Sequence, residues 1–259
     1  MAYKVGFIGV GNMGGALVRS IARNDKEKEF SLYAFDINTP LLKNLAEELG
    51  IREEDSAKSL VSSSDIIVLA VKPQYCDHVL EYIKPALQPE KILVSVAVGL
   101  SIEYYKNILG PKAKVVRTMP NTPALVGAGM TLVSWDDLIS NDEKKVIMKL
   151  LSFSGLVEEL DESLMCEVTA LTGSSPAYVF MLIEAMADAA VKSGILRNQA
   201  YRLAAQAVLG SAKMVLDTGK HPGELKDMVC SPAGTTIEAV AALEREGFRN
   251  AIMTAMEEC

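Results

Sequence analysis

The chain has 259 residues, 49% of them hydrophobic and 23% charged, so it is long enough for one large domain or two smaller ones with buried cores. Its 33 acidic residues outnumber its 26 basic residues, and no basic cluster stands out, which argues against a nucleic-acid partner. The four cysteines form no CxxC pair, and only two histidines accompany them, so no metal site is expected.

Scattered single cysteines are typical of a reducing compartment. The first residues, MAYKVGFIGVG, have the pattern of a strand that enters a glycine loop, without the basic region or cleavage site of a signal peptide. No uncharged apolar run reaches the length of a membrane span. We therefore expect a cytoplasmic protein without a membrane partner.

The first half of the chain alternates strand-like and helical patterns, which predicts an α/β fold. Apolar runs predict strands at five places, namely Tyr3–Ile8, Ser31–Phe35, Ile66–Val71, Ile92–Val98 and Val115–Met119. Such alternation is typical of a doubly wound, mostly parallel sheet covered by helices on both faces. We assign residues 1–160 to this domain.

A glycine-rich segment, Gly9-Val10-Gly11-Asn12-Met13-Gly14, follows the first predicted strand and opens a helix. In a Rossmann-type loop the first glycine allows the tight turn, the second lets the backbone approach a pyrophosphate, and the third lets helix and strand pack closely. The alternative is a turn whose glycines serve packing only. The context favours a site for NAD(P)H.

Asp36 ends the second predicted strand, near the spacing expected for a carboxylate that accepts hydrogen bonds from the coenzyme ribose. Its charge would oppose a 2′-phosphate. The alternative is that Asp36, Asn38 or Thr39 caps the next helix. The choice between NADH and NADPH stays open at this point.

The second half changes character near Asp161, because strand-like runs cease after Leu164 and alanine-rich helices follow. Ser174-Ser175-Pro176 predicts a helix start, and residues 177–191 are apolar around most of the helix. The part of the chain after Asp161 is too short to bury such a helix on all sides. Residues 161–259 are therefore interpreted as an all-helical domain that dimerises. The alternative is a central helix of a monomer.

Two more helices are predicted beyond it, over Asn198–Leu216 with Gly219 at the end, and from His221-Pro222 into Val229. The sequence then turns at Ser231-Pro232-Ala233-Gly234, and Thr235 and Thr236 open another helix. Two readings are possible. The threonines cap the helix, or the turn receives a small anionic substrate.

Six ordered segments give the chain a family resemblance over essentially its whole length. They are FIGVGNMGGAL at 7–17, AVKP at 70–73, VSVAVG at 94–99, RTMPNTPALVGAGMT at 117–131, TALTGSSPAYVF at 169–180 and SPAGTTIEAV at 231–240. With them the chain resembles the pyrroline-5-carboxylate reductases, the enzymes of the last step of proline synthesis. The last three segments are the most specific.

The resemblance implies a role for each matching position. Cofactor contacts are implied for Gly9, Gly11, Asn12, Met13, Ala70, Val71, Lys72, Pro73, Ala97 and Asn121, and Pro123 would help Asn121 shape the pocket floor. Gly14 and Asp36 join this cofactor site through the glycine motif and its spacing. Substrate contacts are implied for Glu162, Ala233, Gly234, Thr235 and Thr236, of which Thr236 would be catalytic. Ala233 stands where the family usually has glycine, and Val98 where alanine is common. The resemblance also implies a homodimer or a ring of dimers.

The implied reaction is hydride transfer from NAD(P)H to the C=N bond of a cyclic imine carboxylate, which needs alignment rather than a covalent catalyst. A second hypothesis is a β-hydroxyacid or 6-phosphogluconate-type dehydrogenase. Its catalytic lysine would lie on the helix after the interdomain link, where Lys192 comes too late, and Lys72 belongs to another motif. A third hypothesis is a non-catalytic nucleotide-binding regulator, against which the intact SPAGTT and AVKP segments argue.

Overall fold

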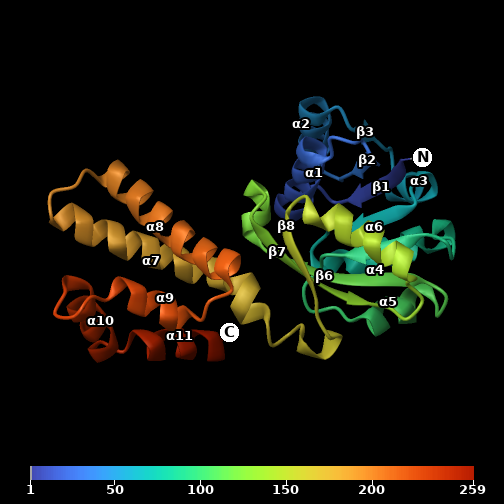
Figure 1. The fold of residues 1–259 in the computed structure, drawn as a ribbon. Coiled ribbons are helices and arrows are strands. Elements are labelled where there is room, and N and C mark those ends of the chain that lie inside the picture. Colours follow the sequence, from blue (N-terminus) through green and yellow to red (C-terminus); the bar gives the residue numbers. More distant parts are fainter. Residues whose placement is uncertain (1) are drawn as a thin grey trace. The chain divides into compact units, whose positions relative to one another are not determined.

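The computed structural model describes residues 2–259, which form two compact units (Figure 1), one up to Gly173 and one from Ser174 onwards. The sequence places the domain boundary earlier, between residues 160 and 161. The segment that joins these two positions contains two short helical turns, η4 (Glu162–Leu164) and η5 (Thr169–Ser174).

The first unit is built on a sheet in the order β3-β2-β1-β4-β5-β6-β7-β8, in which only β6 and β7 pair antiparallel among the described strands. The strands are β1 (Tyr3–Ile8), β2 (Phe30–Phe35), β3 (Arg52–Glu53), β4 (Ile66–Leu69), β5 (Ile92–Ser95), β6 (Lys114–Pro120), β7 (Gly129–Trp135) and β8 (Gly155–Glu159). β2 and β3 lie on one side of β1, and β4 and the later strands lie on the other. This reversal of strand order at β1 is typical of doubly wound folds.

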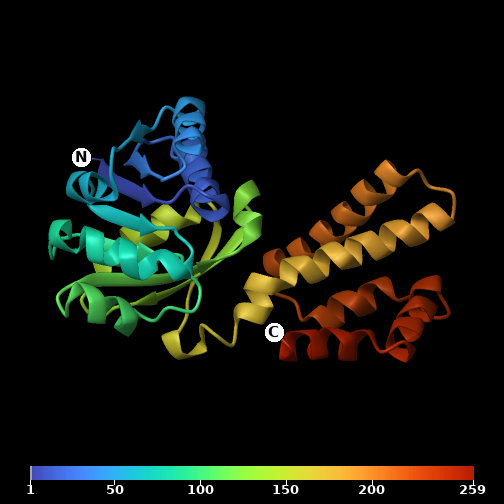
Figure 2. The same ribbon diagram turned by 180° about the vertical axis from the view of Figure 1, so that it is seen from behind.

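Helices cover both faces of this sheet (Figures 1 and 2). Alternate residues of each strand point to opposite faces, so Phe7 packs with one set of helices and Ile8 with the other. The first set is α1 (Asn12–Asn24), α2 (Thr39–Leu49) and α6 (Asn141–Ser152); the second is α3 (Ala57–Ser63), α4 (Cys76–Ile83) and α5 (Ile102–Leu109). Short turns η1 (Pro73–Tyr75), η2 (Lys84–Ala86) and η3 (Thr122–Val126) complete the unit.

The carboxyl ends of the central parallel strands meet at one edge of the sheet. Ile8 pairs with Phe35 on one side and with Leu69 on the other, and Leu69 pairs with Ser95. The residues that follow these four strand ends are therefore neighbours. Ligands of open α/β sheets bind at this edge.

The five strands expected from the sequence are confirmed, with shifted ends. β4 and β5 stop at Leu69 and Ser95, before the predicted Val71 and Val98, because the chain leaves the sheet there although it stays apolar. β3, β7 and β8 were missed. β3 has two exposed residues, and β8 is held by pairing with β7, a partner distant in sequence that no local pattern reveals.

The second unit is all helical. Its helices are α7 (Ser175–Lys192), α8 (Arg197–Thr218), α9 (Pro222–Val229), α10 (Thr235–Arg245) and α11 (Phe248–Glu257). The four helices predicted from the sequence are confirmed as α7 to α10, and α11 was missed. Gly219 ends α8 in the left-handed conformation, as expected for a C-cap. α7 and α8 lie side by side (Figure 1), and small residues at their contact, Ala187, Ala200 and Ala204, are buried.

Much of the apolar surface of the second unit is uncovered. Phe180 and Met181 of α7 are 63% and 69% exposed in the single chain.

None of the helices in the described part of the chain is both long and apolar enough to cross a membrane.

Candidate active site

Two glycines of the loop after β1 are required by the packing of the chain itself. Gly9 has a φ of 95°, and a Cβ added to it would lie 2.6 Å from the Ala70 carbonyl oxygen. A Cβ on Gly14 would lie 2.1 Å from the Gly9 carbonyl oxygen. Any side chain at these two positions would push β1, α1 and the end of β4 apart.

Gly11 differs from its two neighbours. A Cβ added to Gly11 would have no atom of residues 2–259 within 4 Å outside its adjacent residues, and its φ is −62°, which any residue adopts. Gly11 is also the N-cap of α1, and the described residues supply no side-chain hydrogen bond to cap that helix. Asn12 and Met13 form its first turn, so the free N–H groups of α1 face open space that suits a phosphate.

Asp36 fixes the shape of this loop. Its Oδ2 accepts a hydrogen bond from the Val10 N–H at 2.7 Å, and its Oδ1 accepts one from the Asn38 N–H at 2.8 Å. Asn38, by contrast, caps α2 by accepting from the Leu41 N–H at 3.2 Å. The helix cap left open by the sequence is thus Asn38, and Asp36 holds a carboxylate beside the glycine loop.

A cavity of about 440 Å³ opens next to Asp36, within the size range of small-molecule sites. Its walls are mostly apolar and come from the ends of β1, β2 and β4 and from α3 and α4; they include Gly9, Asp36, Ile37, Ala57, Val71, Tyr75, His78, Val79 and Tyr82. The sequence analysis did not identify Ile37, Tyr75 or Tyr82. These three large side chains are exposed beside the glycine loop, which would mark them as binding residues. Exposure cannot be read from the sequence, so the prediction could not include them.

The segment after β4 contains Ala70, Val71, Lys72 and Pro73. The Ala70 N–H donates to the Ile8 carbonyl at 2.8 Å, which extends the sheet pairing to the point where the glycine loop begins. The Lys72 carbonyl starts the turn η1 by accepting from the Tyr75 N–H. The Lys72 side chain is exposed and forms no ion pair with another residue in the range 2–259.

Ala97 and Asn121 lie beyond the next two strand ends. Ala97 is buried, and its N–H donates to the Ser95 hydroxyl at 3.2 Å. The Asn121 amide joins three segments, since its Nδ2 donates to the Thr172 carbonyl at 2.9 Å and its Oδ1 accepts from the Met130 N–H at 2.9 Å. Asn121 therefore holds the loop after β6 in shape, beside Pro123 in η3.

Glu162 is engaged within the first unit. Its Oε1 accepts from the Ile102 N–H at 2.7 Å and forms an ion pair with Nη1 of Arg117, a largely buried residue of β6, at 3.0 Å. The sequence analysis missed Arg117, although a charged residue within the apolar run of a central strand signals such a partner.

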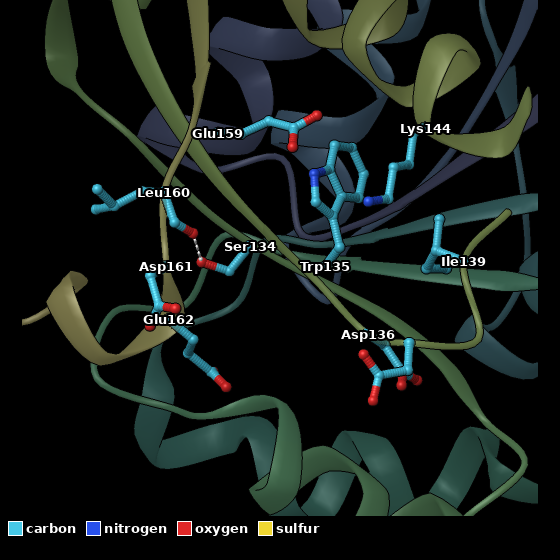
Figure 3. A pocket seen from close by; sticks show the side chains of 10 residues that line it. Ser134, Trp135, Asp136, Ile139, Lys144, Glu159, Leu160, Asp161 and Glu162 are labelled. Carbon is cyan, nitrogen blue, oxygen red and sulfur yellow. Dashed lines mark hydrogen bonds between the residues drawn. The ribbon is translucent and has the colours of Figure 1, made fainter. Parts of the chain in front are cut away.

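Glu162 also borders a hollow of about 570 Å³ at the far ends of β7 and β8 (Figure 3). Asp136 faces the same space, and the Lys144 ammonium lies over the Trp135 ring, 5.3 Å from its centre. None of the other residues predicted for the site lines this hollow.

In the second unit, the SPAGTT segment forms a tight turn in front of α10. The Gly234 N–H donates to the Ser231 carbonyl at 3.0 Å, and Ala233 has a φ of 57°. Positive φ at the third position is the requirement of a type II turn, which glycine normally meets. A Cβ on Gly234 would lie 2.3 Å from the Ser231 hydroxyl, so the turn has no room for a side chain there.

The start of α10 settles the cap question raised by the sequence. Gly234 is the N-cap, and within the described chain no side chain caps the helix. Thr235 and Thr236 lie inside the first turn, where their hydroxyls bond to no other described residue; Thr236 is half-buried and Thr235 is exposed. The reading in which the threonines cap the helix is wrong, and free N–H groups and two free hydroxyls remain.

The histidine, cysteine and carboxylate side chains were the other candidates for a reactive centre. Among residues 2–259 no cluster of histidine, cysteine and carboxylate side chains has the arrangement of a metal site. Cys76 is buried, and burial raises the pKa of its thiol to about 11. The two open helix starts, at α1 beside the carboxyl edge of the sheet and at α10 beside two hydroxyls, are each suited to an anionic group.

Two family descriptions match separate parts of the chain. "Pyrroline-5-carboxylate reductase dimerisation" matches residues 162–259, and "NADP oxidoreductase coenzyme F420-dependent" matches residues 4–99. The second range contains the glycine loop, Asp36, the segment after β4 and Ala97. The first contains Glu162 and the SPAGTT turn.

Similarity to single proteins extends over the whole chain. A pyrroline-5-carboxylate reductase of Escherichia coli is 45% identical over 100% of this chain and 96% of its own. The crystal structure of pyrroline carboxylate reductase from Plasmodium falciparum with NADP bound is similar with a TM-score of 0.86 at 33% identity, over 99% of this chain and 96% of that one. A pyrroline-5-carboxylate reductase structure from Coxiella burnetii gives a TM-score of 0.90 at 30% identity, over 100% and 96%.

Proposed function

The chain belongs to the pyrroline-5-carboxylate reductase family and reduces 1-pyrroline-5-carboxylate to L-proline with NAD(P)H, and from this premise we propose how its residues divide the reaction. The first unit binds the coenzyme, and the second binds the imine. This assignment leaves no place for the hydroxyacid dehydrogenase or the non-catalytic regulator as alternatives.

Coenzyme binding uses the carboxyl edge of the sheet. The N–H groups at the start of α1, with Gly9, Gly11, Asn12, Met13 and Gly14, receive the pyrophosphate. Asp36 accepts hydrogen bonds from the adenosine ribose in the cavity beside it. The nicotinamide half would extend in the other direction, over Ala70, Lys72, Pro73 and Ala97, because β4 and β5 follow β1 in the sheet. Val71 would lie between the two halves, since it also lines the cavity beside Asp36.

Substrate binding uses the turn before α10, and its uncapped helix start is the observation that carries the proposal. The Gly234 N–H already donates to the Ser231 carbonyl, so the free N–H groups of the first turn of α10, at Thr235 and Thr236, hold the carboxylate of the imine. Thr236 places its hydroxyl at the ring nitrogen. Its half-buried position suits a directed hydrogen bond better than the exposed Thr235 does.

In the reaction, the bound coenzyme supplies a hydride to the carbon of the protonated C=N bond. The Thr236 hydroxyl stabilises the ring nitrogen as it becomes an amine, so its hydrogen bond strengthens toward the transition state. The protein contributes alignment of donor and acceptor, not a covalent intermediate.

Asn121 and Glu162 also organise the site. Asn121 keeps the loop after β6 in place through its two hydrogen bonds. Glu162 ties its segment to β6 through Arg117, and the family resemblance leads us to propose that it lies near the substrate. In the same way, we propose that the coenzyme domain covers residues 1–160 and the substrate and dimerisation domain residues 161–259.

For the assembly, we propose a homodimer, with rings of dimers as an extension. The exposed apolar side chains of α7 and α8 form the contact, and the SPAGTT turn of one chain completes the site of the partner. Mixing a Gly11→Val chain with a Thr236→Val chain tests the shared site. Hybrid dimers should regain activity that neither variant has alone, and mixtures as inactive as their parents would contradict it.

The experiment for the function is oxidation of NADH and NADPH by the pure protein in the presence of pyrroline-5-carboxylate, with proline quantified as the product. Stoichiometric proline is expected. Coenzyme oxidation without proline would contradict the assignment. The unpaired cysteines lead us to propose the cytoplasm as the location, which fractionation of cells would check.

A further inference from the structure

A buried group of hydroxyls lies directly behind the loop that follows β5. The Ser95 hydroxyl and the Tyr105 hydroxyl are 2.5 Å apart, and either can be the donor. Both residues are 0% exposed. A buried polar group is costly unless it is hydrogen-bonded, so this pair is held together strongly.

The pair acts on the backbone of the coenzyme loop. The Ser95 hydroxyl oxygen also accepts a hydrogen bond from the Ala97 N–H at 3.2 Å. The Ser95 carbonyl oxygen accepts one from the Thr118 hydroxyl at 2.8 Å. Ser95 is therefore fixed from three sides, by α5, by β6 and by its own loop. Beyond Ala97 the loop is open, with Val98 56% exposed and Gly99 at a φ of 83°.

Tyr105 is a suitable anchor for such a contact. Its ring is enclosed among the apolar residues that pack α4 and α5 against the sheet. Burial raises the pKa of its phenol to about 12, so the hydroxyl stays neutral at working pH. The anchor therefore keeps its hydrogen-bonding capacity under all conditions in which the reaction is measured.

We propose that Tyr105 and Ser95 are positioning residues for hydride transfer, in which Tyr105 holds the Ser95 hydroxyl and Ser95 holds the Ala97 backbone against the nicotinamide ring. This rests on the proposed course of the coenzyme over the ends of β4 and β5. Neither residue touches the reacting atoms. A shift of Ala97 by a fraction of an ångström would change the distance over which the hydride moves, and rates are sensitive to such displacements.

The test is the substitution Tyr105→Phe, which removes one oxygen and keeps the ring in the core. The rate of hydride transfer in a single turnover should fall about tenfold, and the KM for NADH should change less than about twofold. The isotope effect with NADH deuterated at the transferred position should rise toward its limit. The matched control is Tyr104→Phe, since the Tyr104 hydroxyl bonds the exposed Asp77; it should behave as the wild type.

A double-mutant cycle with Ser95→Ala gives a second readout. Because Tyr105 acts through Ser95, adding Tyr105→Phe to Ser95→Ala should slow hydride transfer little further. The proposal is overturned if Tyr105→Phe lowers only the melting temperature and transfers hydride at the wild-type rate, or if the two losses multiply in full. These outcomes differ from those expected if the proposed function were wrong, because the wild-type protein itself would then not reduce the imine.

Discussion

The two units of the chain differ in how far they bury their large apolar side chains. The first unit surrounds one sheet with helices and buries large side chains such as Phe7, Leu60 and Tyr105 completely. In the second, the buried hydrophobic residues of the described chain are three alanines, while nineteen large hydrophobic side chains are exposed. Burying one such side chain is worth about 1.5–3 kcal/mol, so a partner that covers several of them would stabilise the second unit substantially.

The contrast extends to the site. In the first unit, glycines and buried hydrogen bonds fix the loops that we propose to bind the coenzyme. In the second, the free N–H groups at the start of α10 form the substrate site that we propose. Changes in the first unit should therefore alter coenzyme kinetics, and changes in the second should alter assembly and imine kinetics.

The largest effect is expected from breaking the apolar contact of the second unit. Phe180→Glu places a carboxylate in the proposed interface, where an unpaired charge is strongly unfavourable. Light scattering should show dissociation, and activity should fall about a hundredfold or more, because in the proposed assembly each site needs residues of both chains. Leu138→Lys, which changes an exposed side chain of the first unit, should leave mass and activity unchanged. An active monomer in either the variant or the wild type would refute this.

The next effect concerns the turn of the second unit. Thr236→Ala should lower kcat/KM for the imine about tenfold to a hundredfold, because a hydrogen bond that strengthens in the transition state is lost. The KM for NADH should hardly change. Thr235→Ala is the control, with an exposed hydroxyl and an expected loss below about threefold. Equal losses in both variants would show that Thr236 has no special role.

In the first unit, Asp36 should control the choice of coenzyme. Its carboxylate is held beside the cavity by two backbone N–H groups and opposes a 2′-phosphate, so NADH should be competitive with NADPH or preferred. Asp36→Asn should move the ratio of kcat/KM values toward NADPH by about tenfold. A wild-type preference for NADPH of about a hundredfold or more, roughly 2.7 kcal/mol, would mean that Asp36 does not contact the ribose.

The smallest effect compares two alanines of the second unit. Ala233 has a φ of 57°, a conformation that costs a residue with a side chain about 1–2 kcal/mol. Ala233→Gly should therefore keep or raise the free energy of unfolding, by up to about 1 kcal/mol after the added entropy of the unfolded glycine. Ala239→Gly, inside α10, should lower it by about 1 kcal/mol. Thermal unfolding of both variants measures the sign, and a loss at both positions would contradict the argument.

The sequence predicted the parts of the molecule that depend on local pattern. Strand periodicity located the central strands, and the spacing of Gly9, Gly11 and Gly14 located the coenzyme loop. It could not predict β8, whose existence depends on pairing with β7, or the partner of Glu162, which lies 45 residues away in the chain.

The cap of α10 shows a second limit. Threonines at a helix start favour a cap by composition alone, yet Gly234 takes that position because the turn closes on Ser231. The same holds for Tyr105. Its apolar surroundings are predictable from α5, but the hydroxyl contact to Ser95 depends on how the helix packs on β5.

The open space around Gly11 has a consequence for how substitutions would be tolerated. The chain packs against Gly9 and Gly14, whereas a Cβ added at position 11 would have no atom of residues 2–259 within 4 Å apart from its adjacent residues. A library screened for expression or protease resistance would therefore retain many side chains at position 11 and reject them at 9 and 14. A screen for growth without proline would reject all three. Comparing the two screens at position 11 would therefore separate the requirements of folding from those of activity.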